Sequence, residues 1–203
     1  MTPDADADLF AVIHRQRAAR SFSSEPVPDE ALARVLDAAT FAPSAENRQP
    51  WEFVVVRDED ARQQLGDVMQ RAWAGGGKDF AAARISAGML ADVDRGMTGG
   101  VAGAPVLLVV AADTERGLEE TVPSSIFPAV QNLLLAATAL GLGSALTTLA
   151  TVFAAEVRAL TGLPDHVQPV ALIPLGYPAR PLGPPRREPF SAHTHRGRYG
   201  EAW

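Results

Sequence analysis

The sequence contains no cysteine, and this absence excludes several kinds of chemistry at once. Disulfide frameworks, thiolate zinc sites and cysteine nucleophiles all require that side chain. The sequence also lacks a G-x-G-x-x-G fingerprint after a strand, a Walker loop, an H-E-x-x-H pair and a G-x-S-x-G elbow. No side chain stands out as a general acid or base. Redox chemistry in this chain would therefore need a bound cofactor that carries the reaction.

Excess basic charge and long apolar runs are also missing. A net charge of −6 over 203 residues argues against a general nucleic-acid binder, which needs a basic balance. No uninterrupted apolar run approaches the roughly eighteen residues that predict a membrane span. The N-terminal segment MTPDADADLF is acidic and does not resemble a secretory signal. We therefore expect a cytoplasmic protein without nucleic-acid or membrane partners.

The composition that is present is that of an ordinary globular protein. Hydrophobic residues make up 47% and charged residues 21%, and the length suits one core. The proline-rich sequence after Gly176 cannot sustain a helix or a central strand. We expect residues 1–203 to form a single domain, of which residues 177–203 are an extended C-terminal arm.

Hydrophobic periodicity predicts alternating helices and strands. Helices are expected at residues 8–20, from residue 29 to before Pro43, and at residues 58–69, 124–140 and 154–160. Strands are expected at residues 51–56, 105–112, 145–149 and 167–175. The first two strands do not alternate with polar residues, so we expect them to be covered on both faces.

Residues 71–103 are the least decided part of the chain. Glycines at positions 75–77 and at 99–100 bracket a moderately helical stretch. Because glycine favours flexible backbone, the segment is interpreted either as a mobile flap or as a surface helix pair with loose connections.

The strongest functional pattern lies within residues 15–56. Arg17 and Arg20 are three residues apart, so on a turn or short helix they lie on one side and could clamp a phosphate. The turn at residues 42–50 presents a hydroxyl and two carboxamides, which hydrogen-bond a flat heteroaromatic ring without adding charge. Together they indicate a mononucleotide-like cofactor. A solvated surface and ordinary turn chemistry are the alternative explanations.

The order R-x-x-R, then P-V-P-D-E, then A-P-S-x-x-N-x-Q-P-W-x-F-V-V-V resembles the opening of the nitroreductase family of FMN-dependent oxidoreductases. The resemblance continues at residues 104–110 and 125–143, and so spans most of the chain. It implies an α+β, nitroreductase-like fold with a mixed, mainly antiparallel sheet flanked by helices. It also implies an intertwined homodimer with FMN at the subunit interface.

The activity that the resemblance implies is hydride transfer from NADH or NADPH through flavin N5 to a small acceptor such as a nitroaromatic or a quinone. Other flavin chemistry on this scaffold, such as dehalogenation, heterocycle oxidation or flavin fragmentation, is an alternative. A non-catalytic FMN-binding protein is another.

The resemblance also assigns basic residues to the cofactor. It places Arg17 and Arg20 at the FMN phosphate and ribityl chain, and brings Arg186 or Arg187 to the phosphate from the other side. The spacing to Pro189 favours Arg187, although a basic tail that keeps the arm soluble is the alternative. Many relatives have two arginines followed by serine, whereas here Ala18 removes a hydroxyl contact.

The other residues that the resemblance places at the cofactor are Pro43, Ser44, Asn47, Gln49, Ser125, Thr147, Thr148 and Leu149. The turn at residues 42–50 is expected to reach the flavin of the partner subunit. Backbone N–H groups at residues 147–149 are expected to face flavin N5 and O4, where a fixed dipole stabilises the reduced ring. His193 and His195 lack a nearby carboxylate cluster, so no metal site is expected.

Overall fold

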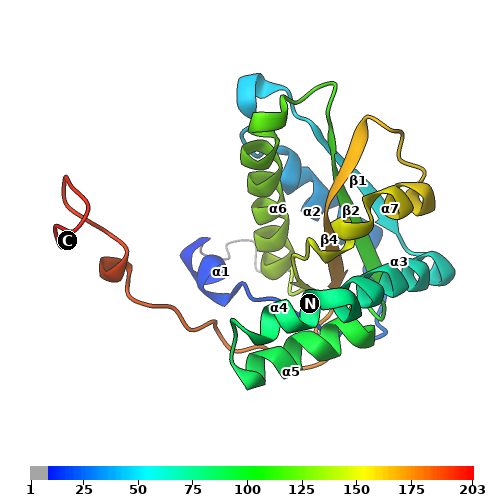
Figure 1. Ribbon diagram of the computed structural model, residues 1–203, viewed down its shortest axis with the longest axis horizontal. Helices are drawn as coiled ribbons and strands as arrows, with labels where there is room; N and C mark the ends of the chain where they lie inside the picture. Colours follow the sequence, from blue (N-terminus) through cyan, green and yellow to red (C-terminus); the bar gives the residue numbers. More distant parts are fainter. Residues whose placement is uncertain (1–8) are drawn as a thin grey trace.

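The computed structural model describes residues 9–203 and is built around an antiparallel sheet (Figure 1). The sheet has the order β1-β2-β4-β3, and its neighbouring strands are all antiparallel. The strands are β1 (Trp51–Val56), β2 (Val106–Asp113), β3 (Gly143–Ser144) and β4 (Val167–Gly176). This arrangement confirms the expected α+β architecture.

The central strand β2 is covered on both faces, as its apolar sequence predicted, whereas the same expectation was wrong for β1, an edge strand on which Val55 is exposed. Every residue of β2 is buried, and alternate residues contact different cores. Val106, Leu108 and Val110 face α2 (Asp29–Thr40) and α6 (Val122–Ala139). Leu107 and Val109 face α3 (Glu59–Ala72) and α7 (Ala154–Thr161). Because side chains alternate along a strand, one central strand joins the two cores.

The first helix is shorter than the sequence pattern predicted. Helix α1 (Leu9–Arg15) ends five residues before the expected boundary, and residue 8 lies outside the described chain. From residue 17 to residue 22 the chain is neither helix nor turn; Ala19 N donates to Ser144 O at 2.9 Å, and Ala18 forms a parallel bridge with Ser144. A pairing with β3, distant in sequence, replaces the last helical turns.

The expected strand at residues 145–149 was wrong. Strand β3 ends at Ser144, which pairs with Leu175, so the next residue would pair with Pro174. Proline has no N–H to donate to that ladder. Only an isolated bridge between Thr147 and Leu172 follows, and the 3-10 helix η5 (Leu149–Phe153) then begins.

Residues 73–100 form a helical pair at one end of the sheet. The π-helical turn η2 (Trp73–Gly77) leads into α4 (Lys78–Ala82), and α5 (Ala87–Arg95) leads into the π-helical turn η3 (Gly96–Gly100). Figure 1 shows α4 and α5 side by side below the sheet. The structure therefore has the helix pair that was one of the two interpretations, and its mobility stays a prediction.

Helix α6 is the central apolar helix of the molecule. Counted from Glu119 to Ala139, it is the one helix within residues 9–203 that is long and apolar enough to cross a membrane by length and composition. Its residues Ile126, Ala129 and Leu133 are fully buried against α2 and the sheet. These contacts are those of a core helix.

The chain leaves the body after β4. Apart from the short 3-10 helix η6 (Phe190–Ala192), residues 177–203 contain neither helix nor extended strand, and the end of the chain projects away from the helices (Figure 1). The part of this segment up to Gly183 is tied to the body: Ser23 N donates to Tyr177 O, Ala179 N donates to Ser21 O, and Gly183 O accepts from Arg17 Nη1.

Candidate functional site

Two adjoining cavities lie where the segment at residues 17–22 meets the sheet. The larger, the arginine cavity, has a volume of about 650 Å³, and the smaller, the α4–α5 cavity, about 330 Å³. Both are lined by Arg20, Ala145 and Leu146. The two cavities therefore adjoin each other, and we treat them as two parts of one site.

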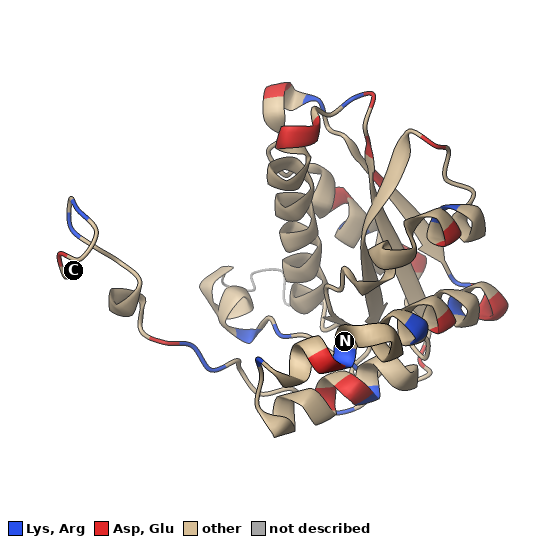
Figure 2. Ribbon diagram, in the orientation of Figure 1, with Lys and Arg blue, Asp and Glu red and all other residues tan. Residues whose placement is uncertain are grey.

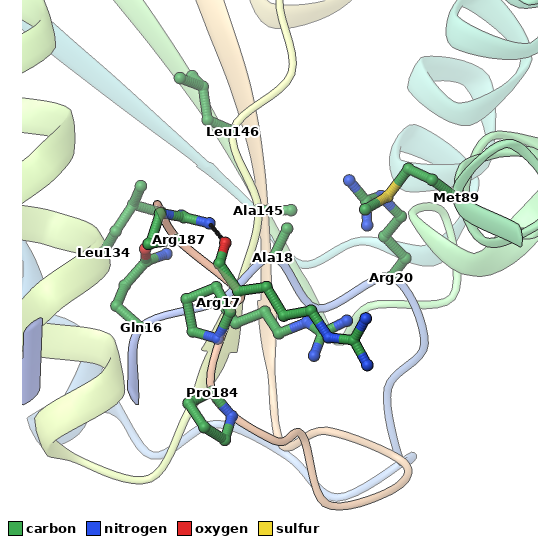
Figure 3. Close-up of a pocket in the computed structure, with 12 residues that line it drawn as sticks. Gln16, Arg17, Ala18, Arg20, Met89, Leu134, Ala145, Leu146, Pro184 and Arg187 are labelled. Carbon is green, nitrogen blue, oxygen red and sulfur yellow. Dashed lines mark hydrogen bonds between the residues drawn. The ribbon is translucent and has the colours of Figure 1, made fainter. Parts of the chain in front are cut away.

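Four guanidinium groups line the arginine cavity: Arg17, Arg20, Arg186 and Arg187. Figure 3 shows Arg17, Arg20 and Arg187 around the same space. No carboxylate lines this cavity within the described chain. Guanidinium is permanently charged and binds phosphate in a forked geometry, so this end of the site suits a dianion.

The first pair of arginines comes together differently from the expectation. Arg17 and Arg20 lie outside any helix or turn, so the predicted turn or short helix was wrong, although both side chains still reach the arginine cavity. The reason is the pairing of this segment with β3. Arg17 Nη1 donates to Gly183 O at 3.1 Å, which ties the segment to the C-terminal arm.

The second pair comes from that arm. Arg187 Nη1 donates to Arg186 O at 2.9 Å, whereas the guanidinium of Arg186 has no hydrogen-bond or ion-pair partner within residues 9–203. Both side chains are exposed. This arrangement does not decide which of the two arginines contacts the phosphate. The guanidinium of Arg186 has more donors available than that of Arg187.

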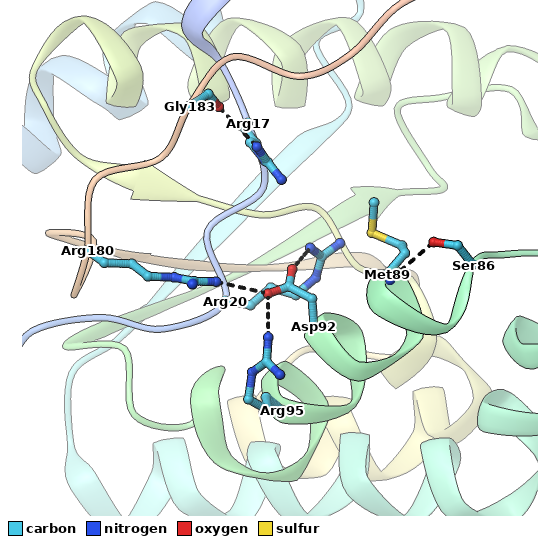
Figure 4. Close-up of polar contacts among 8 residues, drawn as sticks. All are labelled: Arg17, Arg20, Ser86, Met89, Asp92, Arg95, Arg180 and Gly183. Atoms are coloured by element: carbon cyan, nitrogen blue, oxygen red, sulfur yellow. Dashed lines mark hydrogen bonds and ion pairs between the residues drawn. The ribbon is translucent and has the colours of Figure 1, made fainter.

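Arg20 is held by an ion-pair cluster that sequence reasoning missed. Asp92 on α5 accepts from Arg20 Nη1 at 2.9 Å, from Arg95 Nη2 at 3.1 Å and from Arg180 Nη2 at 3.4 Å. Figure 4 shows these three guanidiniums converging on Asp92 from three segments. The cluster fixes the direction of Arg20 and connects α4–α5 to the arm.

Close packing also positions the backbone of Arg20. A Cβ atom at Gly100 would lie 2.0 Å from the carbonyl oxygen of Arg20, and one at Gly96 would lie 2.9 Å from its Cδ. Real Cβ contacts do not occur at these distances, so the end of α5 can touch Arg20 only because these two residues are glycines.

The α4–α5 cavity is mainly apolar. Trp73, Phe80 and Met97 line it on the helical side, and Thr147, Thr148 and Leu149 line it on the other. Two of the expected backbone donors are already used, because Thr147 N donates to Leu172 O at 3.1 Å and Leu149 N donates to the hydroxyl of Thr147 at 3.2 Å. The N–H of Thr148 has no partner within residues 9–203. It is the donor of this trio that is available to a ligand.

A buried indole is anchored beside this cavity. Trp73 Nε1 donates to Asp94 Oδ1 at 2.8 Å, and Lys78 Nζ lies 3.0 Å from the same oxygen. The hydrogen bond from Trp73, followed by that from Lys78, holds the pKa of Asp94 below its usual value near 3.8. The charged side chain of Asp94 thereby fixes the position of the Trp73 ring beside the cavity.

Replacement of Asp94 by asparagine tests this anchor. Because the folded-state pKa of Asp94 is lowered, its carboxylate contributes stability above the unfolded-state pKa and loses it as pH falls through the folded-state value. We expect Asp94→Asn to melt at a lower temperature than the parent at pH 7, and the difference to shrink as pH falls below about 3.8. Melting curves of both proteins across this range measure it. A difference that is equal at both ends would contradict the linkage.

The residues of the turn at 42–50 do not join this site within one chain. Pro43, Ser44, Asn47 and Gln49 lie by the 3-10 helix η1 (Ala45–Asn47) near the opposite end of α6 from the arginine cavity (Figure 1). None of them lines either cavity. Their expected role toward a partner's flavin is a separate prediction.

The turn has its own internal structure. The hydroxyl of Ser44 accepts from Gln49 N at 3.0 Å, and the buried hydroxyl of Ser125 accepts from Ala45 N at 3.1 Å. Glu46, Asn47 and Gln49 all have positive φ, between 50° and 54°. Such backbone is uncommon outside glycine and is a reason to suspect a functional constraint.

His193 and His195 lie on the C-terminal arm. His193 Nε2 lies 3.0 Å from Glu188 Oε2. Within the described residues, no group of three histidine, aspartate or glutamate side chains is placed to hold a metal ion.

Comparison with known proteins places this geometry in a family. The nitroreductase family profile matches residues 13–177, which covers the sheet and both cavities except for the arm. This chain belongs to the nitroreductase family. The matched range includes the three stretches that carried the resemblance, within residues 15–56, 104–110 and 125–143.

Individual relatives differ in what they are named for. The NADH dehydrogenase of Thermus thermophilus is 31% identical over 93% of this chain and 94% of its own. A structure of iodotyrosine deiodinase bound to FMN and 3-iodo-L-tyrosine has a TM-score of 0.74 and 27% identity, over 95% of this chain and 99% of the other. A protein from Desulfovibrio desulfuricans in complex with FMN has a TM-score of 0.70 and 28% identity, over 95% and 98%.

Proposed function

We propose that this protein is an FMN-dependent oxidoreductase that transfers hydride from NADH or NADPH to a small acceptor such as a nitroaromatic or a quinone. The observation that carries the proposal is the junction of a cavity lined by four arginines with an apolar cavity that holds one available backbone donor. The named activity of the Thermus relative and the FMN in two similar structures support it.

The donor set fits FMN. A cavity lined by guanidinium groups and no carboxylate suits a phosphate dianion, and about 650 Å³ joined to about 330 Å³ has room for a mononucleotide beside a small molecule. Arg17, Arg186 and Arg187 would hold the phosphate. Arg20 and the N–H of Thr148 are among the polar groups that remain for the ring.

When bound, FMN supplies two-electron chemistry by accepting hydride and passing it on. The overall balance with a quinone is NAD(P)H + H⁺ + quinone → NAD(P)⁺ + hydroquinone. With a nitro compound it is NAD(P)H + H⁺ + R–NO₂ → NAD(P)⁺ + R–NO + H₂O. Each balance consumes one proton.

The residues of the chain supply orientation and charge. A fixed N–H dipole at Thr148 and the cation of Arg20 stabilise electron density that grows near them during reduction. Helices α4 and α5 cover the apolar cavity and keep water from part of it. No carboxylate or histidine lines either cavity within residues 9–203, so we assign proton delivery to water.

The functional unit that we propose is a homodimer. Leu9, Phe10 and Ile13 on α1 and Phe127 on α6 are exposed, and the arm projects away from its own body (Figure 1). A second subunit would cover such apolar surface and would bring the turn at residues 42–50 to the other site. Sedimentation velocity should give the mass of two chains, and a stable monomer would contradict this arrangement. The cytoplasmic location stays a prediction.

Anaerobic reduction tests the proposed function directly. Purified protein reconstituted with FMN should be yellow, and NADH or NADPH should bleach the flavin band in a stopped-flow experiment. A quinone added afterwards should restore the band. Protein that binds no FMN would refute the cofactor assignment. Bound flavin that neither nicotinamide reduces would favour a non-catalytic FMN-binding protein.

A further inference from the structure

Positive charge gathers around the candidate site although the chain as a whole is acidic, with a net charge of −6. A third cavity of about 250 Å³ adjoins the other two and is lined by Arg17, Arg20, Arg95 and Arg180. Asp92 is the one carboxylate that lines any of the three cavities within the described chain. The field at the site is therefore positive on balance.

Asp79, Asp92 and Asp94 lie on α4 and α5 beside the site, whereas another acidic group lies far from it. Figure 2 shows the acidic turn that precedes α6, with Glu119 and Glu120, at the opposite end of this helix from the basic stretch at residues 186–187. This separation of charge favours the approach of anions to one end of the molecule.

The lining of the α4–α5 cavity is also positively charged. Arg20 is the one ionised side chain that lines it within residues 9–203, and the other lining groups are apolar, small or hydroxyl-bearing. Its volume of about 330 Å³ suits a molecule with one aromatic ring. Trp73 and Phe80 offer aromatic surface to such a ring.

The two carboxylates of α5 are already engaged. Asp92 is shared by three guanidiniums, and Asp94 is held by Trp73 and Lys78. An ammonium group that entered the cavity would meet Arg20, and no carboxylate lines the cavity within residues 9–203. Desolvation of an unpaired charge is costly, and repulsion by a like charge adds to the cost.

We propose that the α4–α5 cavity selects single-ring aromatic acceptors that carry negative charge and rejects those that carry an ammonium group. The proposal rests on the proposed function, because it names the acceptor class of the same site. It distinguishes this protein from the deiodinase neighbour, whose structure holds 3-iodo-L-tyrosine, an amino acid. The selectivity originates in Arg20 and in the lack, within residues 9–203, of a carboxylate that lines the cavity.

Three compounds that share one ring test the charge preference. The FMN-loaded, oxidised protein is titrated with 4-nitrobenzoate, 4-nitrobenzyl alcohol and 4-nitrobenzylamine, and binding is followed by the change in the flavin absorbance. We expect the carboxylate to bind at least about tenfold more tightly than the amine, with the alcohol between them. Added salt should reduce this ratio. Equal or tighter binding of the amine would overturn the proposal.

A variant that changes charge outside the wall of the α4–α5 cavity makes the test sharper. In Arg95→Ala/Arg180→Ala, Asp92 keeps only Arg20 as a partner and neutralises it more fully. We expect this variant to lose several-fold affinity for 4-nitrobenzoate and little for the alcohol. Arg34→Ala on α2, an exposed arginine outside these cavities, is the matched control.

The outcomes separate this proposal from the proposed function. Equal losses for the acid and the alcohol in the double variant would indicate a general distortion and would refute the charge mechanism. Because the titration uses oxidised flavin, it needs no turnover. A protein that shows the expected binding order but is not reduced by either nicotinamide would keep the selectivity and lose the oxidoreductase assignment.

Discussion

Replacing Arg17 and Arg20 together by alanine is expected to weaken FMN binding by about 100-fold or more. Each charge-assisted hydrogen bond to a phosphate or ring oxygen contributes about 1.5–3 kcal/mol, so two lost contacts amount to about 3–6 kcal/mol. Titration of the apoprotein with FMN, followed by flavin fluorescence, measures the change.

The fold should survive this double substitution. Arg17 is exposed, and Asp92 keeps Arg95 and Arg180 as partners when Arg20 is removed. Circular dichroism and the melting temperature check that the variant is folded. Arg34→Ala is again the matched control, since it removes an arginine outside the cavities. Unchanged FMN affinity in the folded double variant would remove both arginines from the cofactor site.

Replacing Gly100 by alanine is expected to damage stability and cofactor binding together. The added Cβ would lie 2.0 Å from the carbonyl oxygen of Arg20 and 3.2 Å from that of Arg95, so backbone must move. Overpacking of this kind costs about 1–3 kcal/mol, and each kcal/mol lowers the melting temperature of a chain of this size by about 2–4 °C. The same movement displaces Arg20, so FMN affinity should fall although no charge is removed.

Gly88 on α5, the helix that leads into η3, provides the matched control. A Cβ atom there has nothing within 4 Å, and alanine is the better helix former by about 1 kcal/mol. Gly88→Ala should therefore keep or raise the melting temperature and leave FMN affinity unchanged. If Gly100→Ala behaves like Gly88→Ala, the close approach of η3 to Arg20 does not constrain the site.

Elements with strong local patterns were predictable from the sequence. The strand at residues 51–56 has the expected boundaries, because β-branched and aromatic residues lie between Pro50 and a polar segment. Helix α2 begins at Asp29 after Pro28 and ends at Thr40, before Pro43, as its apolar stripe and prolines indicated. In both, the signals that define the element are neighbours in sequence.

The failures have a different origin. Helix α1 is shortened because residues 18 and 19 pair with Ser144, and β3 is shortened because its neighbour on β4 would be Pro174. Neither partner is within 25 positions of the residue that it affects, so a local window of sequence does not contain the information.

Some residues of the candidate site were likewise predictable from the sequence, and others were not. The resemblance identified Arg17, Arg20, Arg186 and Arg187, and all four line one cavity. Asp92 was not predicted, because an acid on a surface helix has no distinctive local pattern. Its role follows from Arg20 and Arg180, which the fold brings to it from two distant segments, together with Arg95 on the same helix.

The sequence by itself determined the kind of protein: a cysteine-free α+β chain, with buried strands and arginines at both ends of the functional region. These features depend on residue type and periodicity, which are local. Only the tertiary structure decided that Arg20 lies outside any helix or turn, that Gly100 contacts it, and that Asp92 is shared among three guanidiniums. Hydrogen bonds, steric contacts and Coulomb interactions act over a few ångströms in space, and the distance along the chain does not enter them.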